Sequence, residues 1–226
     1  MIQAFLFDFD GVLVNSIAYH IQAWQEEFSK LGIQIDPNDL YLREGSRASA
    51  IGRALFEKAG IQISEKQLDD FIAKKRKRYA EITQAGLVPG ARELLLEIKR
   101  RGLKIGLVTG SVWENILAVL DQQVVALFDG IVTGRDVVHG KPHPESYLKG
   151  AEKLGVPPEA CVVVENAPFG ITSAKKAGMF CLAVESTLDG SHLGDADLIF
   201  QGLPEVLENL DKILQLAEVK VEIPAK

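Results

Sequence analysis

The sequence predicts an α/β fold: a doubly wound, mostly parallel sheet of the Rossmann type, with an all-helical cap domain inserted after the first strand. Three observations support this prediction. The short apolar runs are continuous rather than alternating, as in strands that are covered on both faces. From residue 94 onward these runs alternate with helical patterns. Residues 17–85, which follow the first apolar run, contain no convincing strand.

Six apolar runs are the predicted strands. In chain order they are Ala4–Phe7, Leu103–Thr109, Gly130–Thr133, Cys161–Val164, Phe180–Val184 and Leu198–Phe200. Apolar stripes at helical spacing lie near several of them, and a glycine that can end a helix follows each stripe. The stripes lie within residues 94–98, 147–154 and 171–177, and the glycines are Gly102, Gly155 and Gly178.

The region after the first strand is predicted to be a separate helical domain. Apolar residues recur at helical spacing from Ile17 to Leu31, and residues 51–55 and 68–72 carry two further amphipathic patterns. The predicted boundaries are 17–85 for this cap domain, and 1–16 together with 86–226 for the catalytic core domain. The basic run Lys74–Arg78 within the cap is interpreted as a solvated helix face rather than a nucleic-acid patch.

Composition limits the class of function. The net charge of −6 argues against sequence-independent binding of nucleic acid, so a protein without a nucleic-acid partner is expected. No apolar run is long enough for a transmembrane helix, and the N-terminus lacks the basic start of a signal peptide. Cys161 and Cys181 lie in apolar runs, as buried reduced thiols do. We therefore expect a cytoplasmic protein without a membrane partner, either a monomer or a small homo-oligomer.

Two acidic residues stand where the first predicted strand ends, in the run Phe7-Asp8-Phe9-Asp10-Gly11. Because alternate side chains of an extended chain share a face, Asp8 and Asp10 should point the same way, roughly 6–7 Å apart. That spacing leaves room for a phosphoryl group between two carboxylates. In open α/β sheets ligands bind beyond the carboxyl ends of the strands, where these acids lie. Taken alone, the pair could equally be a polar strand end or a helix cap.

The other polar candidates also accompany predicted strands. Thr109-Gly110-Ser111 comes at the end of the second strand, Lys141 precedes a predicted helix, and Glu165-Asn166 follows the fourth strand. Together with Asp8 they supply a nucleophile, a hydroxyl donor, a cation and a second acidic site. Those are the parts that aspartyl-phosphate chemistry requires. Pro142 disfavours helical geometry at Lys141, so this lysine is expected on a loop.

In this combination the chain resembles the haloacid dehalogenase superfamily, in the group that carries a helical cap after the first strand. Asp8-Phe9-Asp10-Gly11-Val12, Thr109, Lys141 and Glu165 are similar to its four motifs in order, and the match covers nearly the whole chain. The resemblance implies that Asp8 is the nucleophile and that Asp10 is the general acid/base. It also implies that the backbone carbonyl of Asp10 helps to bind Mg²⁺.

Mg²⁺ is the expected cofactor, because a carboxylate nucleophile and an anionic phosphate ester repel each other. A hard cation that bridges Asp8 and a phosphate oxygen reverses that repulsion. Lys141 is expected to offset further charge, and Thr109 to donate a hydrogen bond to a phosphoryl oxygen. Many relatives carry two acids where this chain has Glu165-Asn166. Glu165, Asn166 or both are expected to hold the metal, directly or through water.

Within the superfamily the cap resembles that of β-phosphoglucomutase and related sugar phosphatases. His20 and Trp24 match that group, Lys75 is similar to another of its cap lysines, and residues 43–47 resemble its cap loop, in which basic residues hold a distal phosphate. The resemblance implies a small phosphorylated metabolite as the partner. The implied substrate-binding residues are His20, Trp24, Arg43, Arg47, Lys75, Gly110 and Ser111.

Plainer interpretations of the cap residues remain open. Trp24 lies on an apolar helix stripe, which favours packing over contact with a substrate. His20 is also consistent with a surface or hinge residue. Arg43 and Arg47 are equally explained as surface charge.

Two departures from the mutase pattern bear on the substrate. Trp113 stands near where that group has a phosphate-contacting polar residue, and His143 stands where a small residue is usual. These departures favour a magnesium-dependent phosphatase that hydrolyses a small phosphate monoester, such as a sugar phosphate, through an aspartyl-phosphate intermediate. The alternative is a β-phosphoglucomutase-type mutase, which the basic cap residues favour.

Three other classes of protein fit less well. A non-catalytic phosphoaspartate receiver is far shorter and lacks a helical insertion after its first strand. A catalytically inactive binding protein is disfavoured because Asp8 and Asp10 are both intact. A dehalogenase of the same superfamily generally lacks the second acid, so Asp10 speaks against it.

Overall fold

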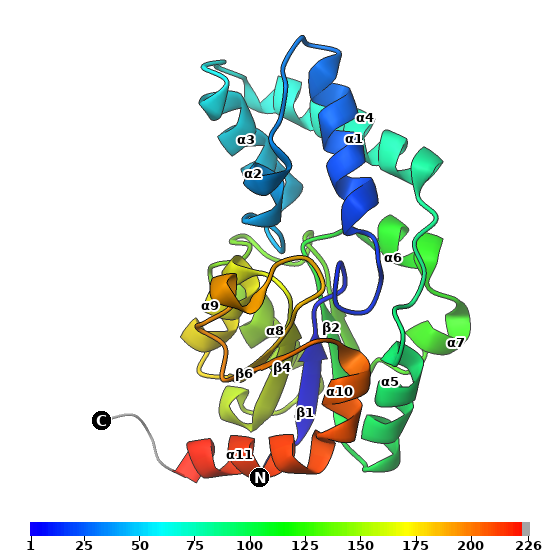
Figure 1. The fold of residues 1–226 in the computed structure, drawn as a ribbon, viewed down its shortest axis with the longest axis vertical. Coiled ribbons are helices and arrows are strands. Elements are labelled where there is room, and N and C mark those ends of the chain that lie inside the picture. The colour runs from blue at the N-terminus through cyan, green and yellow to red at the C-terminus, as the bar shows by residue number, and fades with distance from the viewer. Residues whose placement is uncertain (223–226) are drawn as a thin grey trace.

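The computed structural model describes residues 1–222, and a parallel sheet of six strands forms its centre (Figure 1). Each strand lies within one residue of a predicted run, and the predicted fold class is confirmed. In space the order is β3-β2-β1-β4-β5-β6. The strands are β1 (Ala4–Phe7), β2 (Lys104–Val108), β3 (Gly130–Val132), β4 (Cys161–Glu165), β5 (Phe180–Val184) and β6 (Leu198–Phe200).

The strand order reverses at β1, which pairs with β2 on one side and with β4 on the other. Phe7 is level with Leu107 of β2 and with Val164 of β4, so the carboxyl ends of the three strands lie side by side. In doubly wound sheets this reversal leaves a crevice outside the carboxyl ends, where ligands bind. Asp8, Thr109 and Asn166 follow the three strands directly and are thereby brought to this crevice.

Helices cover both faces of the sheet. In β1, Phe5 and Phe7 belong to one hydrophobic cluster, whereas Ala4 and Leu6 belong to the other. Because both faces are covered, the strands are continuously apolar. The first cluster includes residues of α5 (Ala91–Arg100), α6 (Trp113–Val119), α7 (Gln122–Val125), α10 (Leu203–Glu208) and α11 (Leu210–Glu222), and the second includes residues of α8 (Glu145–Leu154) and α9 (Pro168–Lys176). Two short 3-10 helices, η1 (Pro158–Ala160) and η2 (Gly190–His192), complete the core.

The cap consists of four helices between β1 and α5, and it lies beyond the carboxyl edge of the sheet (Figure 1). It has a hydrophobic cluster of its own, in which the rings of Phe28 and Phe71 are 4.7 Å apart. A capping box between Ser64 and Gln67 starts its longest helix. The inserted helical cap is confirmed, while its boundaries at 17 and 85 stay a prediction. The helices are α1 (Ile17–Ser29), α2 (Pro37–Tyr41), α3 (Ala48–Lys58) and α4 (Glu65–Ile82).

The two chain segments that join cap and core are tied to each other. The backbone N–H of Asn15 donates to the carbonyl of Gly86 at 3.1 Å. In return, the side-chain oxygen of Asn15 accepts from the N–H of Gly86 at 2.8 Å. These hydrogen bonds hold the two connecting segments side by side, so both chain connections between the cap and the core lie at one place.

The basic run in α4 corrects the sequence-based interpretation. Lys74 and Lys77 are exposed, as a solvated face requires, but Lys75 is only 5% exposed. Lys75 lies on the side of α4 that faces the interior, because α4 packs against α1. Cys161 and Cys181 are buried free thiols, as predicted. Across the part of the chain that the structure describes, no helix combines the length and the apolar character needed to cross a membrane.

Candidate active site

Asp8 lies directly beyond β1 and is 2% exposed. Its Oδ1 accepts a hydrogen bond from Lys141 Nζ at 2.7 Å. Burial raises the pKa of Asp8 to about 7, although the Lys141 ammonium opposes this rise and the Glu165 charge adds to it. A carboxylate in this position is poorly hydrated and depends on neighbouring cations for its charge. That combination suits a nucleophile that acts beside a cation.

Lys141 lies on the loop between β3 and α8, and its side chain is 1% exposed. Besides Asp8, its ammonium contacts Glu165 Oε1 at 2.6 Å and the carbonyl of Val108 at 3.2 Å. Burial lowers the pKa of Lys141, but the charges of Asp8 and Glu165 outweigh it, so the pKa is raised overall. The buried ammonium is therefore charged and joins the ends of β1, β2 and β4.

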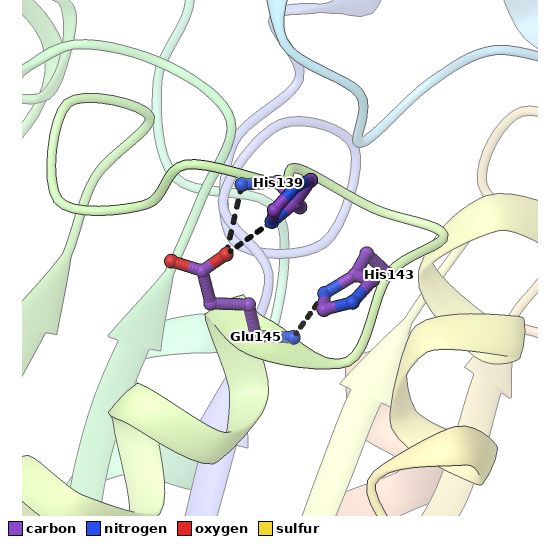
Figure 2. A group of neighbouring side chains, drawn as sticks. All are labelled: His139, His143 and Glu145. Atoms are coloured by element: carbon purple, nitrogen blue, oxygen red, sulfur yellow. Dashed lines mark hydrogen bonds and ion pairs between the residues drawn. The ribbon is translucent and has the colours of Figure 1, made fainter.

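Glu145, in the first turn of α8, closes the loop that carries Lys141 (Figure 2). Its carboxylate accepts from the backbone N–H groups of Val138 at 2.9 Å and His139 at 2.8 Å, which lower the pKa of Glu145 to about 2. The ring of His143 accepts from the N–H of Glu145 at 3.2 Å. Metal-binding atoms of the two histidines and Glu145 lie within 4.8 Å of one another, but the carboxylate is already engaged. We interpret the group as a clamp that positions Lys141.

Glu165 and Asn166 end β4 and differ in how their oxygens are used. Glu165 Oε1 accepts from Lys141 and from the Tyr147 hydroxyl at 2.8 Å, and Oε2 accepts from the N–H of Asn166 at 2.9 Å. Gly170 permits this packing, because a Cβ there would lie 1.7 Å from Glu165 Oε1. Asn166 is fully buried, yet its Oδ1 has no hydrogen-bond partner among the described residues. Of these two predicted metal-binding residues, only Asn166 has an unused oxygen.

Asp10 is held by three donors. The hydroxyls of Ser16 and Ser111 each lie 2.6 Å from its carboxylate, and His20 Nε2 lies 3.0 Å away. Burial alone would raise the pKa of Asp10, but the charge of His20 and these hydrogen bonds outweigh it and hold the pKa well below its usual value. In this arrangement Asp10 is ionised, which is the form that accepts a proton.

Thr109 and Gly110 follow β2. Thr109 is 2% exposed, and its hydroxyl accepts a hydrogen bond from the N–H of Ser111 at 2.9 Å. Gly110 faces the cap, and a Cβ there would lie 2.8 Å from the carbonyl oxygen of Ser46. A side chain at this position would push the cap loop away. Gly110 therefore allows the cap to approach the end of the strand.

His20 connects the core to the cap. Its ring stacks on Tyr79 with centroids 3.9 Å apart, and its Nδ1 lies 2.7 Å from Lys75 Nζ. Burial lowers the pKa of Lys75 to about 7, and burial together with the charge of Lys75 lowers the pKa of His20. Lys75 Nζ also lies 5.2 Å from the ring centroid of Trp24. A chain of contacts thus runs from Asp10 through His20 to Lys75.

One cavity, with a volume of about 80 Å³, is lined by both domains. The volume is well below the roughly 300–1,000 Å³ of usual small-molecule sites. The cap therefore leaves little free volume above the carboxyl ends of the strands. The predicted residues that line the cavity are Asp8, Asp10, Thr109, Gly110 and Ser111 of the core and His20, Trp24 and Lys75 of the cap.

Several residues singled out in the sequence do not line this cavity. They include the buried core residues Lys141, Glu165 and Asn166, and also Arg43, Arg47 and Trp113. Arg43 donates to the carbonyl of Asp39 at 3.0 Å, and Arg47 donates to the carbonyl of Val138 at 2.8 Å. Trp113 is 40% exposed. Contact between the two arginines and a substrate stays a prediction, and it requires a different position of the cap or of the arginine side chains.

The sequence analysis missed Glu44. This cap residue lines the cavity, is 8% exposed and accepts a hydrogen bond from Asn166 Nδ2 at 3.1 Å. Burial and the charges of Asp10 and Asp8 raise the pKa of Glu44 to about 9. Its signal in the sequence is weak: it is a single acid directly before Gly45, between the basic residues Arg43 and Arg47.

Comparison with known proteins gives a consistent result. A family model described as a hydrolase, haloacid dehalogenase-like hydrolase, matches residues 2–178. The validoxylamine A 7'-phosphate phosphatase of Streptomyces hygroscopicus subsp. limoneus is 33% identical over 213 residues, 91% of this chain and 96% of that protein. The β-phosphoglucomutase of Bacillus subtilis (strain 168) is 29% identical over 230 residues, 98% of this chain and 100% of that protein. The structure of a β-phosphoglucomutase from Clostridium difficile matches with a TM-score of 0.85 and 29% identity, over 97% of this chain and 100% of that one.

Proposed function

The chain belongs to the haloacid dehalogenase-like hydrolases and is an enzyme, and from this premise we propose that it is a magnesium-dependent phosphatase. Its substrate is a small phosphate monoester, a sugar phosphate, and the reaction passes through an aspartyl-phosphate on Asp8. The observation that carries the proposal is the placement of Asp8. A buried carboxylate is paired with the Lys141 ammonium at 2.7 Å, in a cavity shared with Asp10 and covered by the cap.

In the first step Asp8 attacks phosphorus, and the bond to the sugar oxygen breaks. Lys141 engages Oδ1 of Asp8, so the second carboxylate oxygen is available as the nucleophile. The ammonium of Lys141 and the hydroxyl of Thr109 lie where they can offset charge on the phosphoryl oxygens. Both groups are almost fully buried, and electrostatic stabilisation is stronger where water is excluded.

Asp10 transfers protons in both steps. It gives a proton to the leaving sugar oxygen and then takes one from the water that hydrolyses the aspartyl-phosphate. In the structure Asp10 is ionised, which suits the second role. The first role requires a higher pKa, and the negative charge of a bound phosphate ester acts in that direction. The hydroxyls of Ser16 and Ser111 orient Asp10 throughout.

The donor set fits Mg²⁺. Asn166 Oδ1 is buried without a hydrogen-bond partner among the described residues, and carboxylate and carbonyl oxygens are what this hard cation prefers. Asp8, the backbone carbonyl of Asp10, and Asn166 would hold the ion. When bound, Mg²⁺ neutralises the repulsion between Asp8 and the phosphate. The oxygens of Glu165 are occupied, so we assign this residue to positioning Lys141.

A mutase is the second candidate. His20, Trp24 and Lys75 line the cavity from the cap side, where a mutase must hold the far end of a bisphosphate. However, Arg43 and Arg47, the other candidates for a distal phosphate site, donate to backbone carbonyls and lie outside the cavity. We prefer the phosphatase, because a phosphoenzyme without a firmly held second substrate is discharged by water.

The test measures both outcomes in one reaction. The enzyme is incubated with Mg²⁺, β-glucose 1-phosphate and a catalytic amount of glucose 1,6-bisphosphate, and glucose 6-phosphate and free phosphate are quantified. A parallel screen of sugar phosphates with and without a chelator identifies the ester that is hydrolysed. We expect chelator-sensitive release of phosphate. Rapid isomerisation with little free phosphate would establish the mutase instead.

A further inference from the structure

The cap loop between α2 and α3 places a carboxylate in the catalytic centre. Glu44 Oε2 accepts hydrogen bonds from Asn166 Nδ2 at 3.1 Å and from the Thr187 hydroxyl at 3.3 Å. The other carboxylate oxygen, Oε1, is buried and has no hydrogen-bond partner among the described residues. Oδ1 of Asn166, the residue that contacts Glu44, is also buried without a hydrogen-bond partner among the described residues. Two unpartnered buried oxygens thus belong to one contact between cap and core.

Unpartnered buried oxygens are rare, because each loses its hydration without a compensating interaction. The surroundings raise the free-energy cost of burying these two oxygens, because the carboxylates of Asp8 and Asp10 line the same cavity as Glu44. Among the described residues no basic side chain forms an ion pair with Glu44, and the ammonium of Lys141 is engaged by Asp8 and Glu165. The centre is therefore rich in oxygen donors and short of positive charge, which fits a hard divalent cation.

The loop that carries Glu44 packs closely against the core. Gly45 has a φ of +77°, and a Cβ there would lie 3.1 Å from Lys141 Cδ. The hydroxyl of Ser46 donates to the carbonyl of Lys141 at 3.0 Å. These contacts exist only while the cap loop lies on the core. The place of the Glu44 carboxylate beside Asn166 therefore depends on this position of the cap loop.

We propose that Glu44 is a cap-borne ligand of the divalent-cation site, and that it supplies the acidic group which the core lacks at Asn166. Cation binding and cap closure are then coupled: the closed cap binds the cation more tightly, and by reciprocity the cation favours the closed cap. This inference rests on the proposed function, because it places the cation at the phosphoryl-transfer centre.

The first experiment measures cation binding without substrate. Mn²⁺ serves as the probe, and the free ion is followed by electron paramagnetic resonance during titration of the full chain. Glu44→Gln keeps the shape of the side chain and removes its charge, and we expect at least about tenfold weaker binding. Glu57→Gln, an exposed acid on α3, is the matched control and should bind as the wild type does.

The second experiment places a negative charge on the core, at position 166, in the variant that lacks the charge of Glu44. Asn166→Asp should restore most of the Mn²⁺ affinity lost in Glu44→Gln, so the two substitutions are strongly non-additive. Cap position is followed by fluorescence energy transfer between labels on engineered surface cysteines, since Cys161 and Cys181 are buried. Mn²⁺ should shift the wild type toward the closed state, but should no longer do so in the double variant.

Each result decides the question. Wild-type Mn²⁺ affinity in Glu44→Gln overturns the inference, and so does a variant that changes only the KM for the ester, because Glu44 would then bind substrate. If Glu44→Gln does not fold, Asn166→Asp decides alone: it should bind Mn²⁺ more tightly, and unchanged affinity overturns the inference. Failure of the proposed function is a separate observation, namely wild-type protein that binds Mn²⁺ and hydrolyses no phosphate ester.

Discussion

The proposed catalytic groups of the core and those of the cap are held in different ways. Asp8, Lys141 and Glu165 are each at most 3% exposed in their side chains and are joined by hydrogen bonds of 2.6–2.7 Å. They stand at the ends of paired strands, whose register fixes their separation. On the cap side, one carboxylate oxygen of Glu44 has no hydrogen-bond partner within residues 1–222, and Arg47 donates to the backbone carbonyl of Val138 in the core.

This difference suggests that the core groups serve the chemical steps and that the cap groups serve substrate recognition. The cap groups reach the centre only through the way in which the cap packs on the core. Substitutions in the core should therefore affect every substrate alike, whereas substitutions in the cap should depend on substrate, cation or pH.

The largest effect is expected at the nucleophile. Asp8→Asn retains the shape of the side chain and an acceptor for Lys141, but removes the attacking carboxylate. We expect kcat to fall by about 10³-fold or more, for aryl phosphates and sugar phosphates alike. Steady-state kinetics measure the loss, and a thermal melt checks that the variant is folded. Hydrolysis within tenfold of the wild type would contradict the role of Asp8.

Lys141→Met should lower both activity and stability. The substitution leaves the carboxylates of Asp8 and Glu165 buried together without their shared cation. Breaking a buried ion pair from one side costs about 3–5 kcal/mol of unfolding free energy. Urea denaturation measures this change, and Lys176→Met, an exposed lysine of α9, is the control. A stability loss no larger than that of the control would show that the buried pair contributes nothing.

The sequence predicted the core side of this comparison because strand ends fix side-chain positions. Continuous apolar runs identified the strands, and the polar residues directly after β1, β2 and β4 were necessarily neighbours. The cap side was less accessible, because its polar contacts depend on how two domains pack. The burial of Lys75, the contact of Arg47 with Val138 and the approach of Glu44 to Asn166 all follow from that packing and not from helical periodicity.

The burial of Lys75 in the cap should make the stability of the protein depend on pH. The pKa of Lys75 is lowered from 10.5 to about 7 by burial, so between these values the unfolded chain binds a proton that the folded chain does not. The contribution of Lys75 to stability therefore rises as pH increases from about 7 to 10.5, and it is least favourable below pH 7. Lys75→Met should remove this slope, so its stability relative to the wild type falls as pH rises.

Denaturation at several pH values between 6 and 10 measures the effect of Lys75→Met. Lys74→Met is the matched control, because Lys74 is the exposed neighbour on the same helix. We expect the control to follow the wild-type pH profile. Parallel profiles for wild type and Lys75→Met would mean that the buried ammonium keeps its proton across this range.

The smallest effect is expected at Arg47. Its guanidinium donates to the carbonyl of Val138, outside the cavity, so its contact with a substrate depends on a different cap position. If it then holds the distal end of a sugar phosphate, Arg47→Ala removes an exposed charge contact worth about 1 kcal/mol, which raises KM about fivefold. Acetyl phosphate is too short to reach the cap and should be unaffected. Arg53→Ala, which removes another cap arginine that pairs with Glu65, should change neither substrate. Equal changes in KM for both substrates would place the effect of Arg47 on the cap itself rather than on recognition.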